Sequence, residues 1–404
     1  MRMLVYVVFL LCLSIWLVWR INSKKSQLVR YILPIQNNTI FYYLLIALAI
    51  LISAYLFHYI NLISVIACYL ILFTAHEIQW YAFYTQLFKD ELESTATFYG
   101  WCNYFNDAIT NISATIDDGY DFSEGIFHGD FGISNRQAMQ NKYDLYYDYL
   151  KLKPGMKVLD IGCGNGHWGY YLMQRGIQVT GIVISKDNYE ACKNKGLKVI
   201  LGDARIIIKN IQERFDAISA IGPIEHFSSV SQPPRLRVKA LQDYFADVIN
   251  LIDVNSASKM YLNSIMTTNG KSSKYRTLEY YFHFYVIASV FGSGYYPSEN
   301  EIENIYTSKQ STITIKKDYT EDYRYIFVRN KKYLGNFHWQ FNTPKRILYL
   351  IKALLTDPYW PHRLLFGHTG SWLWQFGGNQ KQPMPENKDT PIRAYIYVVE
   401  INSP

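Results

Sequence analysis

The stretch "VLDIGCGNGHWGYYL", from Val158 to Leu172, decides the fold class of this chain. An apolar run ends in an acid, three glycines follow within five residues, and a helical pattern of apolar residues comes next. That order predicts a buried parallel strand over 157–161, a tight turn, and a helix that Gly176 ends. Backbone N–H groups at such a turn can face a bound ligand, and glycines let the ligand approach the backbone.

Such a turn can bind a dinucleotide, a phosphate or S-adenosylmethionine. The position of the acidic residue indicates which of these ligands it binds. A dinucleotide site needs an acid about 20 residues after the glycines, at the end of the second strand. Here the second strand is expected over 177–185 and ends in Ser185-Lys186, whereas the carboxylate, Asp160, ends the first strand. A phosphate-binding P-loop also fails, because no Lys-Ser/Thr follows the last glycine. The motif "DIGCGNG" instead fits class I methyltransferases, which predicts S-adenosylmethionine as the cofactor.

Two further apolar runs continue the α/β pattern. The segment "LKVILGDAR" predicts a third strand that ends near Asp203, a possible acceptor for an adenine amino group or, alternatively, a helix N-cap. The segment "RFDAISAIGPIEHF" predicts a fourth strand that opens into a loop with Glu225 and His226. Open α/β sheets bind their ligands at this edge, although a solvated loop pair is the alternative.

These segments together resemble a known family. In order along the chain, "KLKPGMKVLDIGCGNG", "VTGIVISKDN", "DAR", "FDAISAIGPIEHF" and "GSGYYPSENEI" are similar to the cyclopropane-fatty-acid synthase and mycolic acid cyclopropane synthase family. The resemblance spans roughly residues 120–404. It implies an α/β, Rossmann-like class I methyltransferase domain, a seven-stranded mostly parallel sheet, and a helical, aromatic-rich insert at 319–390 before the last strand.

The resemblance also implies a cofactor site. Its residues lie in the glycine turn, at the end of the second strand and at the end of the third: Asp160, Gly162, Cys163, Gly164, Gly166, Ile184, Ser185, Asn188, Asp203 and Ala204.

The catalytic residues that the resemblance implies are partly altered here. The family holds a base, generally bicarbonate, with a cysteine, a glutamate, a histidine and a late tyrosine. The glutamate corresponds to Glu225, next to His226, and His128 stands about where the cysteine would be. Asn263 in "LNSI" replaces the histidine. The tyrosine is Tyr319 or Tyr323.

The altered residues leave the acceptor open. An alkene acceptor, such as an unsaturated acyl chain, becomes a carbocation on methylation and needs a base to remove a proton. An oxygen or nitrogen acceptor needs only a general base, for which Glu225, His226 and His128 qualify. A protein that binds the cofactor without catalysis is a further alternative, and a nicotinamide oxidoreductase is disfavoured by the missing acid.

The N-terminal part predicts an integral membrane protein. Residues 3–19, 40–57 and 59–75 are nearly continuous apolar runs, each close to the shortest length that spans a bilayer. We expect two or three transmembrane helices in 1–78, a linker and helical cap in 79–125, and the methyltransferase domain in 126–404. The segment 20–39 holds four Lys/Arg and no acid, which places it on the cytoplasmic side of the membrane. If the chain spans the membrane three times, the methyltransferase domain lies on the same side. A cleaved signal peptide, a two-span arrangement and a re-entrant hairpin are the alternatives.

Composition excludes several other classes. The chain has 404 residues, 50% of them hydrophobic, and a net charge of +7 from scattered basic residues, which favours anionic lipid headgroups over nucleic acid. Its five cysteines have no paired spacing, and neither they nor the nine histidines form a metal motif. We expect a membrane lipid or another hydrophobic acceptor, no metal and no obligate protein partner. Residues 337–376 are either an interfacial helix or a lid, and 277–292 either an acyl pocket or core.

Overall fold

A computed structural model describes residue 95 and residues 125–228, 232–273, 275–277, 294–325 and 389–402. The chain divides into two compact units, Met1–Asp90 and Glu91–Pro404, and the described residues belong to the second. The predicted transmembrane helices, the linker apart from residues 95 and 125, and the insert beyond residue 325 lie outside the described residues. Within the described ranges, no helix has the length and hydropathy of a membrane span.

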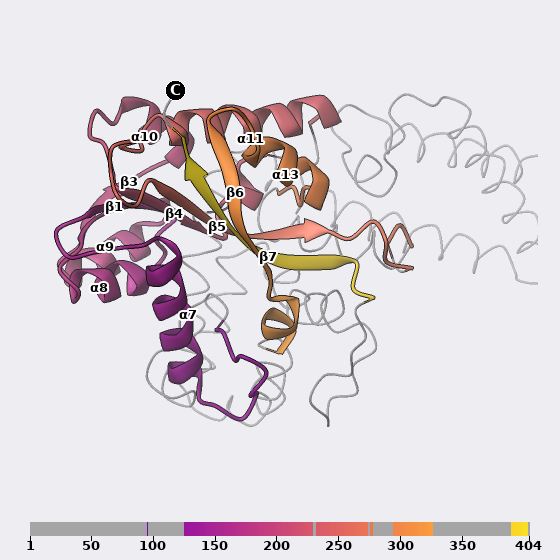
Figure 1. Ribbon diagram of the computed structural model, residues 1–404, viewed down its shortest axis with the longest axis horizontal. Coiled ribbons are helices and arrows are strands. Elements are labelled where there is room, and N and C mark those ends of the chain that lie inside the picture. The colour runs from indigo at the N-terminus through magenta and orange to yellow at the C-terminus, as the bar shows by residue number, and fades with distance from the viewer. Residues whose placement is uncertain are drawn as a thin grey trace, which may run out of the picture. The chain divides into compact units, whose positions relative to one another are not determined.

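One mixed sheet organises the second unit (Figure 1), with the strand order β3-β2-β1-β4-β5-β7-β6. The five strands from β3 to β5 run parallel, and β7 pairs antiparallel with both β5 and β6. This confirms the expected seven-stranded, mostly parallel sheet. The strands are β1 (Lys157–Ile161), β2 (Gln178–Val183), β3 (Lys198–Leu201), β4 (Ala217–Ile221), β5 (Met260–Thr268), β6 (Ser311–Asp318) and β7 (Ile392–Ile401).

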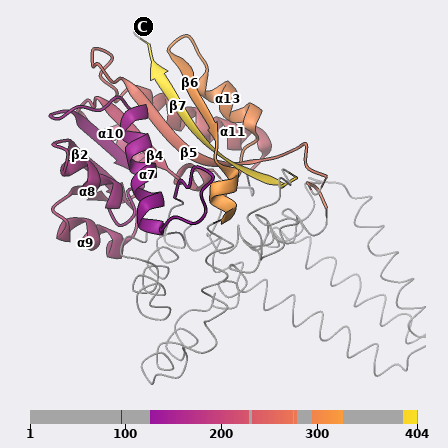
Figure 2. The ribbon, with the colours of Figure 1, turned by 60° about the horizontal axis from the view of Figure 1, so that its bottom comes forward.

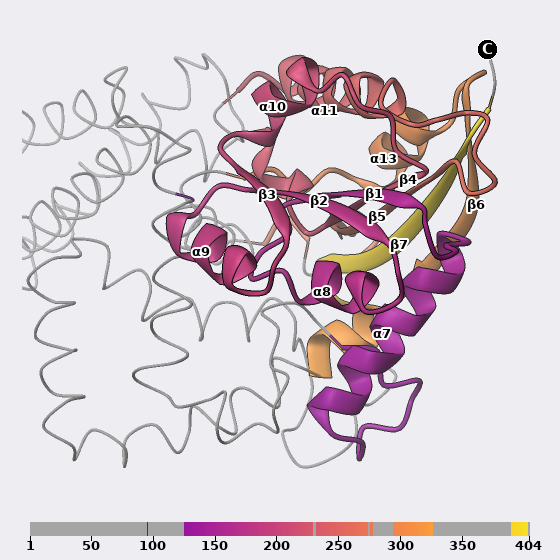
Figure 3. The same cartoon turned by 90° about the vertical axis from the view of Figure 1, so that its left-hand side faces the viewer.

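Helices cover both faces of the sheet (Figure 3), with α8 and α9 on one face and α10 and α11 on the other. Each parallel connection crosses over through a helix, which is how parallel strands are joined. Of the predicted insert, the structure describes a helical turn at 320–325. The helices are α7 (Asn135–Tyr149), α8 (His167–Met173), α9 (Lys186–Asn194), α10 (Ala204–Asn210), the 3-10 turn η2 (Ile224–His226), α11 (Pro234–Ile249) and α13 (Glu299–Tyr306).

The core fixes β1 and the helix that follows it. Val158, Leu159 and Ile161 are fully buried, as expected for a central parallel strand with both faces covered. On the α8 face, Trp168 stacks on Tyr171 with ring centroids 5.4 Å apart, and the aromatic rings of α7 pack against this pair. The turn between β1 and α8 is therefore held between two well-packed elements.

Segments from distant parts of the chain meet at the carboxyl edge of the parallel strands. The strand β7 begins there, because Ile392 pairs with Thr268 at the end of β5. The loop before α7 reaches the turn at 320–325 (Figure 2), where Phe127 N donates to Asp322 Oδ1 at 2.7 Å and Tyr325 OH donates to Phe131 O at 2.7 Å. The site predicted from the sequence lies at this edge.

Candidate functional site

The glycine turn after β1 has the backbone that the motif predicted. Gly162, Gly164 and Gly166 have φ of +73°, +52° and +75°, in the left-handed region that favours glycine. A Cβ at Gly162 would lie 2.7 Å from Pro223 Cβ, and one at Gly166 would lie 2.4 Å from Leu197 Cδ1. At Gly164, by contrast, no atom of the described residues other than its two chain neighbours lies within 4 Å of the added Cβ. Gly162 and Gly166 therefore permit close packing, and Gly164 leaves space that a ligand can occupy.

Hydrogen bonds hold this turn in place. Gly162 N and Cys163 N both donate to the carbonyl of Ile182 on β2, at 2.9 and 3.0 Å. Gly166 N donates to Cys163 O at 2.9 Å, at the point where α8 begins. Backbone contacts within the protein therefore determine the shape of the turn.

Asp160 is oriented by two residues that the sequence analysis did not select. It is 2% exposed, and its Oδ1 accepts a hydrogen bond from Ser219 Oγ at 2.9 Å. Ser219 lies beside Asp160 in the register of β1 and β4, and its Oγ accepts from Trp168 Nε1 at 3.1 Å. A polar serine inside the apolar run "AISAI" is the signal that could have identified it.

The residues predicted on the ribose side lie together at the end of β2. Ser185 and Asn188 are buried polar residues at the start of α9, and Ile184 before them is half-buried. Ser185 occupies the N-cap position of α9, where its side chain makes no capping hydrogen bond. The structure thus brings these three residues next to the glycine turn, which itself bonds to β2.

Asp203 has the geometry of the alternative interpretation, a helix N-cap. Its Oδ1 accepts from Arg205 N at 2.9 Å, and its Oδ2 accepts from Arg205 Nη2 at 2.8 Å. Ala204, the first residue of α10, is buried. The Asp203 carboxylate already binds the Arg205 guanidinium, and an adenine amino group would have to share it. A contact of Asp203 with adenine stays a prediction.

Glu225 is fixed where β4 and β5 end. It lies in η2, is 2% exposed, and its Oε1 accepts from Met266 N on β5 at 2.8 Å. Its backbone carbonyl accepts from Tyr295 N at 2.8 Å. His226 follows in the same turn and is half-buried. The structure therefore brings the predicted glutamate to the edge that carries the glycine turn.

Neighbouring residues of β5 bind to different elements. Asn263, which stands where the family has histidine, is fully buried, and its Nδ2 donates to Tyr306 OH on α13 at 2.5 Å. The next residue, Ser264, has its Oγ 2.5 Å from Tyr319 OH. Successive residues of a strand point to opposite faces, so Asn263 points away from Tyr319, the partner of Ser264. Tyr323, one helical turn after Tyr319, is half-buried.

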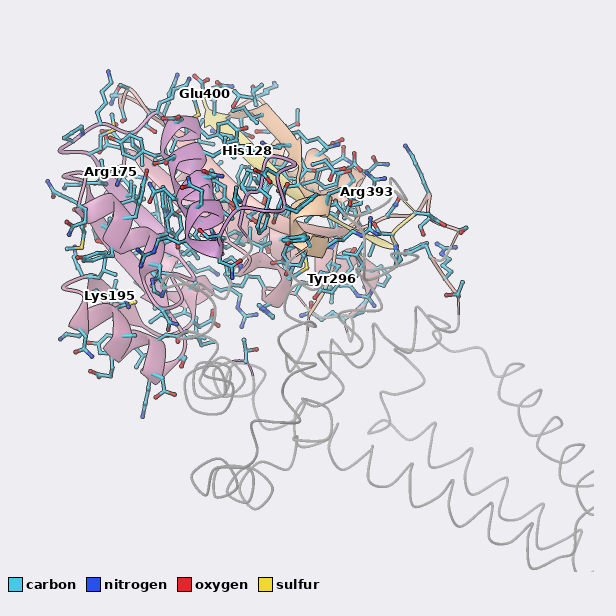
Figure 4. All side chains as sticks on the ribbon, turned by 90° about the horizontal axis from the view of Figure 1, so that it is seen from below. His128, Arg175, Lys195, Tyr296, Arg393 and Glu400 are labelled. Atoms are coloured by element: carbon cyan, nitrogen blue, oxygen red, sulfur yellow. The ribbon has the colours of Figure 1, made fainter. Side chains whose placement is uncertain are left out.

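His128 lies on the loop before α7 (Figure 4), exposed and with a φ of +53°. The neighbouring Phe127 N–H binds the carboxylate of Asp322. Burial raises the pKa of Asp322 above its ordinary value, an effect that the Phe127 N–H and the charges of Lys317 and His128 reduce. His128 thus lies within electrostatic reach of a buried carboxyl group, on a different element from Glu225.

Metal ligation has no support in the described part of the chain, where no group of three or more His, Cys, Asp and Glu side chains is arranged to hold an ion. The strand order with its antiparallel β7, the glycine turn after β1, and the acid at the end of that strand define a class I methyltransferase fold.

The family is narrower than this class. A model of the family described as mycolic acid cyclopropane synthetase matches residues 85–331, and the chain belongs to this family of S-adenosylmethionine-dependent methyltransferases.

The relatives support this assignment. The cyclopropane-fatty-acyl-phospholipid synthase of Escherichia coli (strain K12) is 35% identical over 94 residues, which are 22% of this chain and 24% of that protein. The methoxy mycolic acid synthase MmaA3 of Mycobacterium tuberculosis is 29% identical over 196 residues, which are 44% of this chain and 60% of that one. The chain thus spans between about a quarter and three fifths of these relatives. A crystal structure of mycolic acid cyclopropane synthase CmaA1 has the same fold, with a TM-score of 0.57, 16% identity, and coverage of 77% of this chain and 99% of that one.

Proposed function

We propose that this protein transfers a methyl or methylene group from S-adenosylmethionine to a lipid acceptor, with an unsaturated acyl chain as the first choice. Two relatives support the lipid acceptor: the E. coli protein is a cyclopropane-fatty-acyl-phospholipid synthase, and the mycolic acid cyclopropane synthase CmaA1 was crystallised in complex with SAH and CTAB. A membrane-anchored arrangement with a cytoplasmic domain, as predicted from residues 1–78, fits an acceptor that resides in a bilayer.

The observation that carries the proposal is the open side of Gly164. Among the residues that the structure describes, and apart from the two chain neighbours of Gly164, no atom lies within 4 Å of an added Cβ, whereas Gly162 and Gly166 pack tightly. The residues predicted to hold the cofactor lie in this turn and at the ends of β1, β2 and β3. When bound, S-adenosylmethionine supplies a methyl group on a positively charged sulfur, a strong electrophile.

Asp160 contributes a fixed negative charge beneath the turn. Its carboxylate is held by Ser219 and is almost completely buried, so it does not rotate to meet a ligand. A buried and oriented carboxylate favours a cationic ligand, and it needs little reorganisation when that ligand binds.

Glu225 supplies the base or orients it. Attack of an alkene on the methyl group leaves a carbocation, and product forms only when a proton is removed. The Met266 N–H holds one oxygen of Glu225, which fixes the direction of the carboxylate. His226, in the same turn, and the exposed His128 are further general bases at this edge.

A second acceptor class is favoured by Asn263. Its amide binds Tyr306 in the core, so this position offers no imidazole to a bicarbonate ion. Transfer to an oxygen or nitrogen of a hydrophobic acceptor needs only one general base, and Glu225 or a histidine can act as that base.

Mass spectrometry of lipids from cells that express the chain tests both acceptors. Acyl chains that gain one CH2 would support the first proposal, and a methylated headgroup or other hydrophobic compound the second. Cells that express the Glu225→Gln variant provide the control. If membrane extracts yield no methylated product and the purified protein releases no S-adenosylhomocysteine with them, the proposed activity is wrong.

A further inference from the structure

Cys163 and Cys192 lie side by side at the glycine turn, although 29 residues separate them in the sequence. Their Sγ atoms are 3.8 Å apart. Cys163 belongs to the turn and is half-buried, whereas Cys192 is buried near the end of α9. The cysteine spacing predicted no pairing, and the fold creates one.

Both sulfurs take part in the packing of the turn. Cys192 Sγ donates a hydrogen bond to Gly164 O at 3.3 Å, the carbonyl of the glycine with the open side. A Cβ at Gly166 would come within 2.9 Å of the same sulfur. A Cβ at Gly181 on β2 would come within 2.7 Å of Cys163 Sγ. The two sulfurs therefore pack directly against glycines of the turn and of β2, with no side chain between them.

We propose that Cys163 and Cys192 form an oxidisable pair whose disulfide weakens cofactor binding, an inference that rests on the proposed function. With a peroxide as oxidant, one thiol takes up an oxygen atom, which gives a sulfenic acid and releases one water. The second thiol attacks that sulfur, the S–S bond forms, and a second water leaves. The two sulfurs together lose two electrons and two protons, and the O–O bond of the peroxide accepts both.

The expected effect follows from distances. A disulfide has an S–S length of about 2.05 Å, so the two sulfurs must approach from 3.8 Å. Cys192 then has no S–H to donate to Gly164 O, and α9 is drawn toward the turn. Because α9 also carries Ser185 and Asn188 at its start, both halves of the predicted cofactor site are displaced.

The hydrogen bond between the thiols also favours oxidation. A thiol donor from Cys163 stabilises the thiolate of its neighbour and lowers the pKa of Cys192, while the same hydrogen bond and burial raise the pKa of Cys163. The thiolate is the nucleophile in reactions with peroxides, so a lowered pKa at one member of the pair speeds the first step.

The test uses the full chain with Cys12, Cys68 and Cys102 replaced by serine, which leaves the pair as the only cysteines. Hydrogen peroxide should produce a crosslinked peptide that joins residues 163 and 192, detected by mass spectrometry. Affinity for S-adenosylhomocysteine, measured by calorimetry, should fall at least tenfold and recover with dithiothreitol. Unchanged affinity in fully crosslinked protein, or the absence of a 163–192 crosslink, would overturn the inference.

Two variants control for other oxidative damage. Cys163→Ser and Cys192→Ser, made in the same background, are each compared with themselves before and after peroxide. Neither should lose affinity on oxidation, and an equal loss in both would overturn the role of the pair. Reduced protein that binds no S-adenosylhomocysteine would overturn the proposed function as well. Reduced protein that binds it but forms no crosslink would overturn the oxidisable pair alone.

Discussion

Ser219 Oγ donates a hydrogen bond to Asp160 Oδ1 at 2.9 Å, between two buried residues that lie 59 positions apart in the sequence. Trp168 Nε1 in turn donates to Ser219 Oγ, so a side chain of α8 orients the acid at the end of β1 through a residue of β4. The acid of the glycine motif therefore depends on the sheet as well as on its own segment.

Ser219→Ala should weaken cofactor binding and destabilise the fold. It removes a buried donor to a carboxylate, which costs about 1–3 kcal/mol of unfolding free energy. Affinity for S-adenosylhomocysteine should fall about tenfold, or about 1.4 kcal/mol. Denaturant unfolding and calorimetry measure the two effects. Trp168→Phe, which keeps the ring over Tyr171 but removes the indole N–H, should give a smaller loss of affinity; no loss in either variant would contradict the orienting role.

Gly164→Ala should abolish cofactor binding, because its Cβ enters the space that we assign to the ligand. Gly155→Ala is a matched control: Gly155 also has a positive φ and open space around the added Cβ, but it lies before β1. Both substitutions place alanine in the left-handed region and should cost about 1 kcal/mol of stability. Equal cofactor affinity in the two variants would show that the ligand does not lie on Gly164.

Glu225→Gln should leave cofactor affinity nearly unchanged and lower turnover about 100-fold, the size of a general-base contribution. The amide oxygen of glutamine can still accept the Met266 N–H, so the local structure should persist. Glu213→Gln is the control, since Glu213 pairs with Lys157 and Lys198 at the starts of β1 and β3. A similar loss of turnover in both variants would count against a role for Glu225 in chemistry.

Tyr319→Phe and Tyr323→Phe should separate the two tyrosines that the sequence left open. Tyr319 is buried and hydrogen-bonded to Ser264, so its loss should cost about 1 kcal/mol of stability. Tyr323 is half-buried at the same edge, and its replacement should lower turnover with little change in unfolding. The reverse pattern would make Tyr319 the functional tyrosine.

The contribution of Asp322 to the free energy of unfolding should decrease as the pH rises from its unfolded-state pKa to its folded-state pKa. Burial raises its pKa in the folded state, so the folded protein binds this proton more tightly than the unfolded chain does. Stability from this group is then greatest below the unfolded pKa and declines until the folded pKa is passed. Asp322→Asn removes the titration but keeps an acceptor for Phe127 N–H. Urea unfolding between pH 3 and 7 should show that the free energy of unfolding falls less, or rises more, with pH in the variant than in the unchanged protein; parallel curves would contradict the raised pKa.

The sequence by itself determined the sheet and the class of the protein. The alternation of apolar runs, glycines and helical patterns is local, and it correctly predicted β1, the turn and α8, whereas the seven-stranded sheet was implied by the family resemblance. The predicted second and third strands proved shorter, at Gln178–Val183 and Lys198–Leu201, and Ser185 and Asp203 beyond them are the N-caps of α9 and α10. The Asp203 cap is also local, since its partner Arg205 is two residues away.

Only the tertiary structure decided which side chains meet across strands and helices. The partnership of Ser219 with Asp160, the burial of Asn263 against Tyr306, and the contact of Cys163 with Cys192 each join residues from separate elements. Such contacts depend on strand order, register and the direction of each side chain, and none of these is encoded in the spacing of the residues along the chain. The motif predicts where the cofactor binds, and the packing of the sheet fixes the groups that orient Asp160 within that motif.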